Sequence, residues 1–165
     1  MQQFNLVRNM TRLLVIVLLI TSVLCLTACS YMTDFVVVNE SDEPIVVRYK
    51  VKNYPYTFAP PTTPATVAVS ELSTRGGQKW QELNPTQYQL DPANRTITIR
   101  VMPHNALRVA RARDDGWHQD PSASESFPIE EINVNGANGE LNLKGQQAFT
   151  SFSKVSQALY TLIYK

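Results

Sequence analysis

The residues best suited to binding or catalysis gather in one stretch in the second half of the chain. It holds three arginines, two adjacent aspartates, a tryptophan and a histidine, which are Arg108, Arg111, Arg113, Asp114, Asp115, Trp117 and His118. Arginine and tryptophan dominate binding energetics at protein interfaces, and loops on β scaffolds often carry function. We therefore predict a binding loop formed by Arg111, Arg113, Asp114, Asp115, Trp117 and His118. A strand end followed by a solvated charged loop explains the same residues.

Catalysis has little support in the residue pattern. A hydrolase would have to rely on His118 with Asp114 or Asp115 as its acid–base pair. The other histidine, His104, stands among turn-forming residues, and both histidines are interpreted as solvated loop residues. The sequence contains no Gly-x-Ser-x-Gly elbow, no His-Glu-x-x-His zinc motif and no phosphate-binding glycine loop. We expect a protein that is not an enzyme and that binds no metal or cofactor.

The elements that must position the loop are short β-strands. Apolar and polar residues alternate with period two over residues 45–51, 95–102, 106–112 and 158–164. About eight to ten such runs, separated by turn residues, are typical of a β-sandwich or barrel. The sequence predicts a single all-β domain, an antiparallel β-sandwich with a transthyretin-like or immunoglobulin-like layout. A partly open barrel fits the same spacing.

Two β-hairpins are expected from turn chemistry. The first joins residues 35–38 to residues 45–51 through the polar loop between Asn39 and Pro44. The second turns within residues 135–139, where two Asn-Gly pairs accept positive φ angles. A short strand is also expected at residues 67–72. Near Phe149 and Phe152, three residues apart, the pattern fits either a helix or an irregular strand.

The start of the chain has the layout of a signal peptide. Arg8 and Arg12 are the only charged residues of the first 12, and residues 13–26 carry no charge. This apolar run is shorter than the roughly 20 residues that a membrane-spanning helix needs, and its length is typical of a signal-peptide core.

The residues Leu26-Thr27-Ala28-Cys29 at the end of this run resemble the lipobox of bacterial lipoproteins. Cys25 lacks the small residue that precedes the cleaved bond in that family. The resemblance implies recognition of Leu26, Thr27 and Ala28 by signal peptidase II, cleavage before Cys29, and attachment of diacylglycerol and an acyl chain (palmitate) to Cys29. Ser30 in the next position implies sorting to the outer membrane, because aspartate there retains lipoproteins in the inner membrane.

These features divide the chain into a signal peptide at residues 1–28, a lipidated N-terminus and tether at 29–34, and a β-sandwich at 35–165. Without Arg8 and Arg12 the mature chain has 13 basic and 14 acidic residues. A balance this close to neutral argues against a polybasic surface for nucleic acid. Cys29 is the only cysteine left after cleavage, so no disulfide or cysteine-based metal site is expected.

Function is predicted from the anchor and from the scarcity of catalytic motifs. The first hypothesis is a non-catalytic protein-interaction or structural module at the periplasmic face of the outer membrane. Its partners would be the membrane, through the lipid on Cys29, and another envelope protein. The alternative is a β-sandwich that binds a small ligand or glycan, with Trp80 or Trp117 as a stacking platform.

Overall fold

A computed structural model describes residues 32–52, 64–75, 77–113 and 127–165. Tyr31–Lys165 forms one compact unit. The signal peptide and lipidation site predicted at residues 1–30 lie outside the described residues. No helix within the described ranges is long and apolar enough to cross a membrane.

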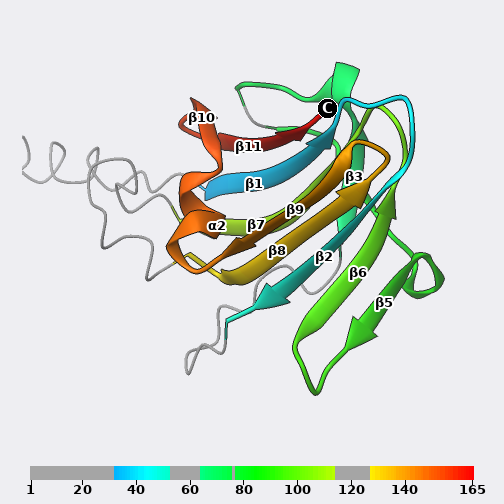
Figure 1. Cartoon of the computed structure of the whole chain (residues 1–165). Helices are drawn as coiled ribbons and strands as arrows, with labels where there is room; N and C mark the ends of the chain where they lie inside the picture. The colour runs from blue at the N-terminus through cyan, green and yellow to red at the C-terminus, as the bar shows by residue number, and fades with distance from the viewer. Residues whose placement is uncertain (1–31, 53–63, 76, 114–126) are drawn as a thin grey trace, which may run out of the picture. The chain divides into compact units, whose positions relative to one another are not determined.

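Two β-sheets pack face to face (Figure 1). In sheet A the strand order is β10 (Ser153–Ser156), β11 (Leu159–Tyr164), β1 (Met32–Asn39), β7 (Asn105–Arg113), β3 (Ala65–Ala68) and β4 (Gln81–Glu82). In sheet B it is β5 (Tyr88–Asp91), β6 (Thr96–Val101), β2 (Ile45–Val51), β8 (Ile129–Gly136) and β9 (Gly139–Lys144). Only β1 and β11 run parallel to each other among these neighbours. The prediction of an all-β sandwich is confirmed.

The main core lies between the sheets and follows the period-two pattern. β2 directs Ile45, Val47 and Tyr49 into this core, while Arg48 is exposed on the opposite face. At one end of the core, aromatic rings gather around Phe35, whose ring centroid lies 4.8 Å from that of Phe127 and 5.1 Å from that of Tyr160. Sheet B therefore has one apolar face and one solvated face, as antiparallel sheets commonly do.

Strand β1 differs, because it is buried on both faces. Every residue from Thr33 to Asn39 is buried. Phe35 and Val37 face the main core, while Val36 and Val38 belong to a second apolar cluster on the outer face of sheet A. That cluster is completed by Val69, Leu72 and Trp80 from the segment between β3 and β4, together with Val67, Ala106 and Leu159. The unbroken apolar run of β1 is the pattern expected of a strand covered on both sides.

The first predicted hairpin is wrong. β1 pairs with β7 and β11 in sheet A, whereas β2 pairs with β6 and β8 in sheet B. The loop at residues 40–44 therefore crosses from one sheet to the other. The reason is burial: the continuous apolar run needs a position covered on two sides, whereas the alternating β2 needs one solvated face. β1 also begins at Met32, earlier than the expected strand start at residue 35.

The other local expectations are confirmed or refined. β8 and β9 form the second hairpin, with Gly136 paired to Gly139 across its turn. The strand expected at residues 67–72 is β3 followed by a 3-10 helix, η1 (Val69–Glu71). A second 3-10 helix, η2 (Pro85–Gln87), precedes β5. The alternatives near Phe149 and Phe152 resolve into a short helix, α2 (Gln146–Thr150), followed by β10.

Candidate functional site

The predicted binding loop lies largely outside the described residues. Arg111 is on β7 and is exposed. Arg113 is the last residue of that strand, and its side chain is not described. Asp114, Asp115, Trp117 and His118 also fall outside the described ranges, so the loop stays a prediction.

Arg111 instead belongs to a charged cluster on the outer face of sheet A, which we call the Asp34 cluster (Asp34, Trp80, Arg108 and Arg111). Arg111 lies opposite Asp34 in the pairing of β1 with β7, and its Nε is 3.2 Å from Asp34 Oδ1. Arg108 Nη1 lies 4.0 Å from the same oxygen. Asp34 and Arg108 are both buried, with side chains 4% and 10% exposed.

A β-bulge explains why both arginines meet one carboxylate. The pairing register shifts between Phe35 and Val36, which pair with Ala110 and Arg108. The intervening residue, Val109, is the extra residue of the bulge. In a regular strand, residues three apart point to opposite faces. The bulge returns Arg108 and Arg111 to the same face, so both lie beside Asp34.

Trp80 joins this cluster to the segment that covers β1. Its Nε1–H donates a hydrogen bond of 3.2 Å to Asp34 Oδ2. The Arg108 guanidinium lies over the indole ring, 4.9 Å from the centroid, which is cation–π geometry. One face of the indole is therefore occupied by protein. Stacking of a glycan on Trp80, the alternative expected from sequence, would have to use the other face.

Burial dominates the electrostatics of the Asp34 cluster. Removal from water raises the pKa of Asp34 above its ordinary value of 3.8, and Arg111, Arg108 and the Trp80 hydrogen bond offset only part of that rise. Burial likewise lowers the pKa of Arg108, against the opposing effect of Asp34. Arg108 Nε also has no hydrogen-bond partner within the described part of the chain. The cluster is thus an enclosed charge pair that fastens the covering segment, with only Arg111 substantially exposed.

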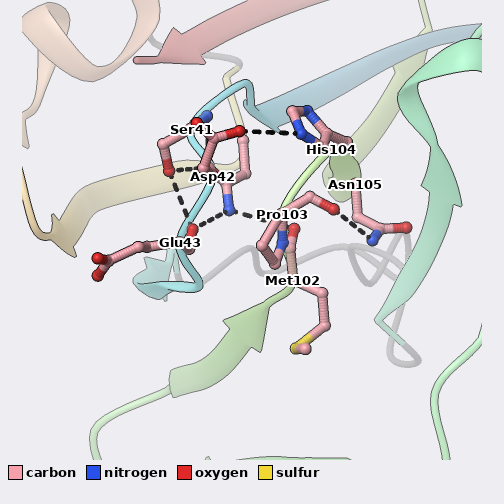
Figure 2. A network of polar contacts seen from close by, with 8 residues as sticks. Ser41, Asp42, Glu43, Met102, Pro103, His104 and Asn105 are labelled. Atoms are coloured by element: carbon pink, nitrogen blue, oxygen red, sulfur yellow. Dashed lines mark hydrogen bonds and ion pairs between the residues drawn. The ribbon is translucent and has the colours of Figure 1, made fainter.

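A second polar centre lies at the other end of β1, where Asn39 is fully buried. The Asn39 Nδ2 group donates to the carbonyl oxygens of Glu43, Val101 and Met102 at 2.9, 3.2 and 3.1 Å. Its Oδ1 accepts hydrogen bonds from the backbone N–H and the hydroxyl of Ser41. The Asn39 side chain therefore ties the β1–β2 loop to the β6–β7 turn. Figure 2 labels residues of both segments around this network.

We call this region the loop end and define it as residues 40–44, 102–104 and 137–138. Its third part, the β8–β9 turn, is held by Tyr164, whose hydroxyl donates to Gly139 O at 2.8 Å and accepts from the Asn138 N–H at 3.1 Å. Gly136 is required there, because a Cβ would lie 2.8 Å from the Tyr164 hydroxyl oxygen. The loop end is therefore built rigidly from three separate turns.

The outer surface of the loop end is mostly polar, and Met102 is its one large exposed apolar side chain. His104, at φ 55°, pairs with Asp42 at 3.3 Å, and both side chains are largely exposed. Met102 is 53% exposed and, in Figure 2, extends away from the hydrogen-bonded network. A shallow hollow of about 440 Å³ lies between the β1–β2 loop and the β8–β9 turn, lined by residues 40–43, Ala137, Asn138 and Lys165.

No metal-binding grouping is found in the described ranges. No three histidine, cysteine or carboxylate side chains there come together in a way that could hold a metal ion. A second hollow on the outer face of sheet B is lined by polar side chains of β2, β6, β8, β9 and the β5–β6 turn, namely Arg48, Lys50, Asn94, Thr96, Glu131, Asn133, Glu140 and Asn142. Its chemistry is that of hydrogen bonding and ion pairing.

Sequence reasoning missed both Asp34 and Asn39. Asp34 stands directly before the apolar run at residues 35–38 and Asn39 directly after it, and a polar residue at the end of a buried strand requires partners. The architecture defines this protein as an all-β sandwich in which one inner strand of sheet A, β1, is covered on both faces. Comparisons of the chain with protein-family models, with curated proteins and with solved structures give no match.

The Asp34 cluster predicts strong coupling between Asp34 and Arg108. Asp34→Leu should lower the free energy of unfolding by about 3 kcal/mol, because it leaves the buried Arg108 without its counter-ion. In the Arg108→Met background the same change should cost about 1–3 kcal/mol less, since the double variant buries an apolar pair. Urea unfolding of all four proteins measures this difference. Additive losses would contradict the coupling.

The loop end predicts that Asn39 acts through its amide donors. Asn39→Asp should destabilise the protein by at least as much as Asn39→Ala, about 2–4 kcal/mol, because a carboxylate oxygen would face three carbonyl oxygens. Asn105→Ala is the control: its half-buried side chain donates one hydrogen bond, to Pro103 O, so its loss should stay near 1 kcal/mol. Thermal unfolding measures all three. A mild Asn39→Asp effect would show that the donors matter little.

Proposed function

We propose that this protein is a lipid-anchored bacterial envelope protein whose β-sandwich binds another envelope protein at the periplasmic face of the outer membrane. The proposal assigns it a non-catalytic role. The observation that best supports this proposal is the position of Cys29, the predicted lipid attachment site. It lies three residues before the start of β1, the strand of sheet A that is covered on both faces.

This spacing makes the anchor short. Three extended residues reach about 10 Å, so the first residue of β1 would lie within that distance of the lipid-bearing residue. Two or more acyl chains hold a protein stably on a membrane without help from its surface. β1 is paired on both sides, with β7 and β11, so a force on the anchor would be carried directly into sheet A.

The loop end is the proposed docking surface for the partner protein. It lies at the far end of β1. This strand has eight residues, so the loop end lies about 26 Å from its start. It thus stays within reach of other envelope proteins whether the domain stands upright or lies along the membrane.

Two properties of the loop end favour a protein partner. Its turns are already held by Asn39 and Tyr164, so binding would require little additional ordering. It also presents the exposed Met102 on the β6–β7 turn and the exposed acidic residues Asp42 and Glu43 on the β1–β2 loop. Methionine is enriched in interface cores, whereas rim positions are polar. The complementary partner surface would offer an apolar pocket flanked by cationic side chains.

The anchor predicts the cellular location of cysteine variants. Cys29→Ser should abolish both lipid attachment and cleavage before residue 29, because the lipobox cysteine is lost, so the mature lipidated form should disappear and the chain should keep its signal peptide. Cys25→Ser is the matched control and should remain membrane-bound. Ser30→Asp should shift the protein from the outer to the inner membrane. Fractionation of bacterial cells with mass spectrometry of the mature chain measures all three. A Cys29→Ser chain that is still cleaved before residue 29, or that still carries lipid, would disprove the anchor.

The docking surface predicts position-specific contacts in intact cells. A photo-crosslinking amino acid at Asp42, whose side chain is 97% exposed, should give one discrete heavier adduct. The same group at Gln89, exposed on the β5 edge, should not. Met102→Asp should lower the adduct yield at position 42 by about tenfold, since a central apolar contact would be lost. Identical adducts at both positions, or an unchanged yield in Met102→Asp, would contradict docking at the loop end.

A further inference from the structure

The last strand of sheet B, β9, has an open edge among the described residues. It pairs only with β8 and has a regular register without a bulge. The other terminal strands, β4, β5 and β10, have two to four residues, compared with six in β9. Open edges of this kind are ready to pair with another strand, and proteins usually shorten, bulge or block them.

The backbone groups available at this edge follow from the hairpin. The Gly145 N–H donates to Glu130 O at 2.8 Å, and Gly139 pairs with Gly136 at the turn. Backbone groups alternate direction along an antiparallel strand. Odd-numbered residues of β9 therefore direct their N–H and C=O groups toward β8. Glu140, Asn142 and Lys144 direct theirs toward the open edge.

The side chains of β9 are self-complementary about Asn142. If two copies of β9 pair antiparallel with Asn142 opposite Asn142, each Glu140 lies opposite Lys144 of the second copy. On the inner face, each Leu141 then lies opposite Leu143 of the second copy, next to the main core that Leu143 joins and Leu141 packs against. This register also brings open backbone groups opposite open backbone groups. Opposite charges placed directly across a strand pair are stabilising.

The charges on this edge are oriented but exposed. Lys144 Nζ lies 3.2 Å from Glu131 Oε1 on β8, and the Lys144 side chain is 66% exposed. Glu140 accepts a hydrogen bond from the Asn133 side chain. These neighbours hold both charges on the outer face of the sheet, where each would meet its opposite charge in the second copy.

We propose that β9 is a homodimer interface, at which two copies of this chain pair antiparallel and join their five-stranded sheets into one continuous sheet. The two-fold axis of such a pair is perpendicular to the sheet and reverses the strand direction. Where the domain is anchored through Cys29, both anchors can enter one membrane only when the strands lie along the membrane plane. The pairing itself does not depend on the proposed docking function.

Disulfide trapping of the full-length chain in bacterial membranes tests this pairing. Cα atoms of a hydrogen-bonded antiparallel pair lie about 5.5 Å apart, within the range of a disulfide. With a mild oxidant, Asn142→Cys should give a covalent dimer. Gln89→Cys on the opposite edge of sheet B, and the unsubstituted chain, should remain monomeric under the same conditions. Crosslinking of Asn142→Cys no faster than of Gln89→Cys would overturn the proposal.

Charge exchange identifies the register. In the Asn142→Cys background, Glu140→Lys or Lys144→Glu should slow dimer trapping by about tenfold, because two symmetric pairs change from attraction to repulsion. The double variant Glu140→Lys with Lys144→Glu should restore the original rate, which also shows that the single variants had not simply misfolded. Equal rates in all four proteins, or no recovery in the double variant, would contradict the proposed register.

Discussion

The structure depends on the burial of β1 on both faces. Its apolar residues serve two clusters at once, with Phe35 and Val37 in the main core and Val36 and Val38 beneath the segment between β3 and β4. A strand of this kind must be covered and must be paired on both sides, because unpaired backbone groups in an apolar environment are costly. The parallel pairing with β11, the antiparallel pairing with β7 and the covering segment around Trp80 all follow from this requirement.

The same burial explains the two polar centres of the domain. Asp34 and Asn39 lie near opposite ends of β1, and both are buried. Each can remain there only because distant segments supply partners: the two arginines of β7 and Trp80 for Asp34, and carbonyl oxygens of the β1–β2 and β6–β7 loops for Asn39. At Asp34 the loss of hydration raises the pKa of the carboxyl by more than the two arginines and Trp80 lower it. At Asn39 both the amide nitrogen and the amide oxygen of the side chain form hydrogen bonds.

The proposals assign different parts of this framework to different contacts. In these proposals the start of β1 would lie close to the lipid anchor, the loop end would bind a partner protein, and the open edge of β9 would pair with a second copy. These three surfaces share no residue, and the loop end adjoins β9 at the β8–β9 turn. Pairing at β9 would add a constraint on orientation, because a two-fold axis that reverses the strands favours a domain lying along the membrane.

The sequence by itself determined the sandwich class and much of the local structure. The alternation over β6 and β11 and the turn residues between β8 and β9 act over neighbouring residues, so their patterns could be interpreted directly. Tertiary structure alone decided that β1 and β2 lie in different sheets, because burial on two faces depends on which segment covers β1. It also decided that a bulge brings Arg108 and Arg111 to Asp34, and that Asn39 bonds to Val101, 62 residues away. Such contacts depend on register between distant strands, which no local period encodes.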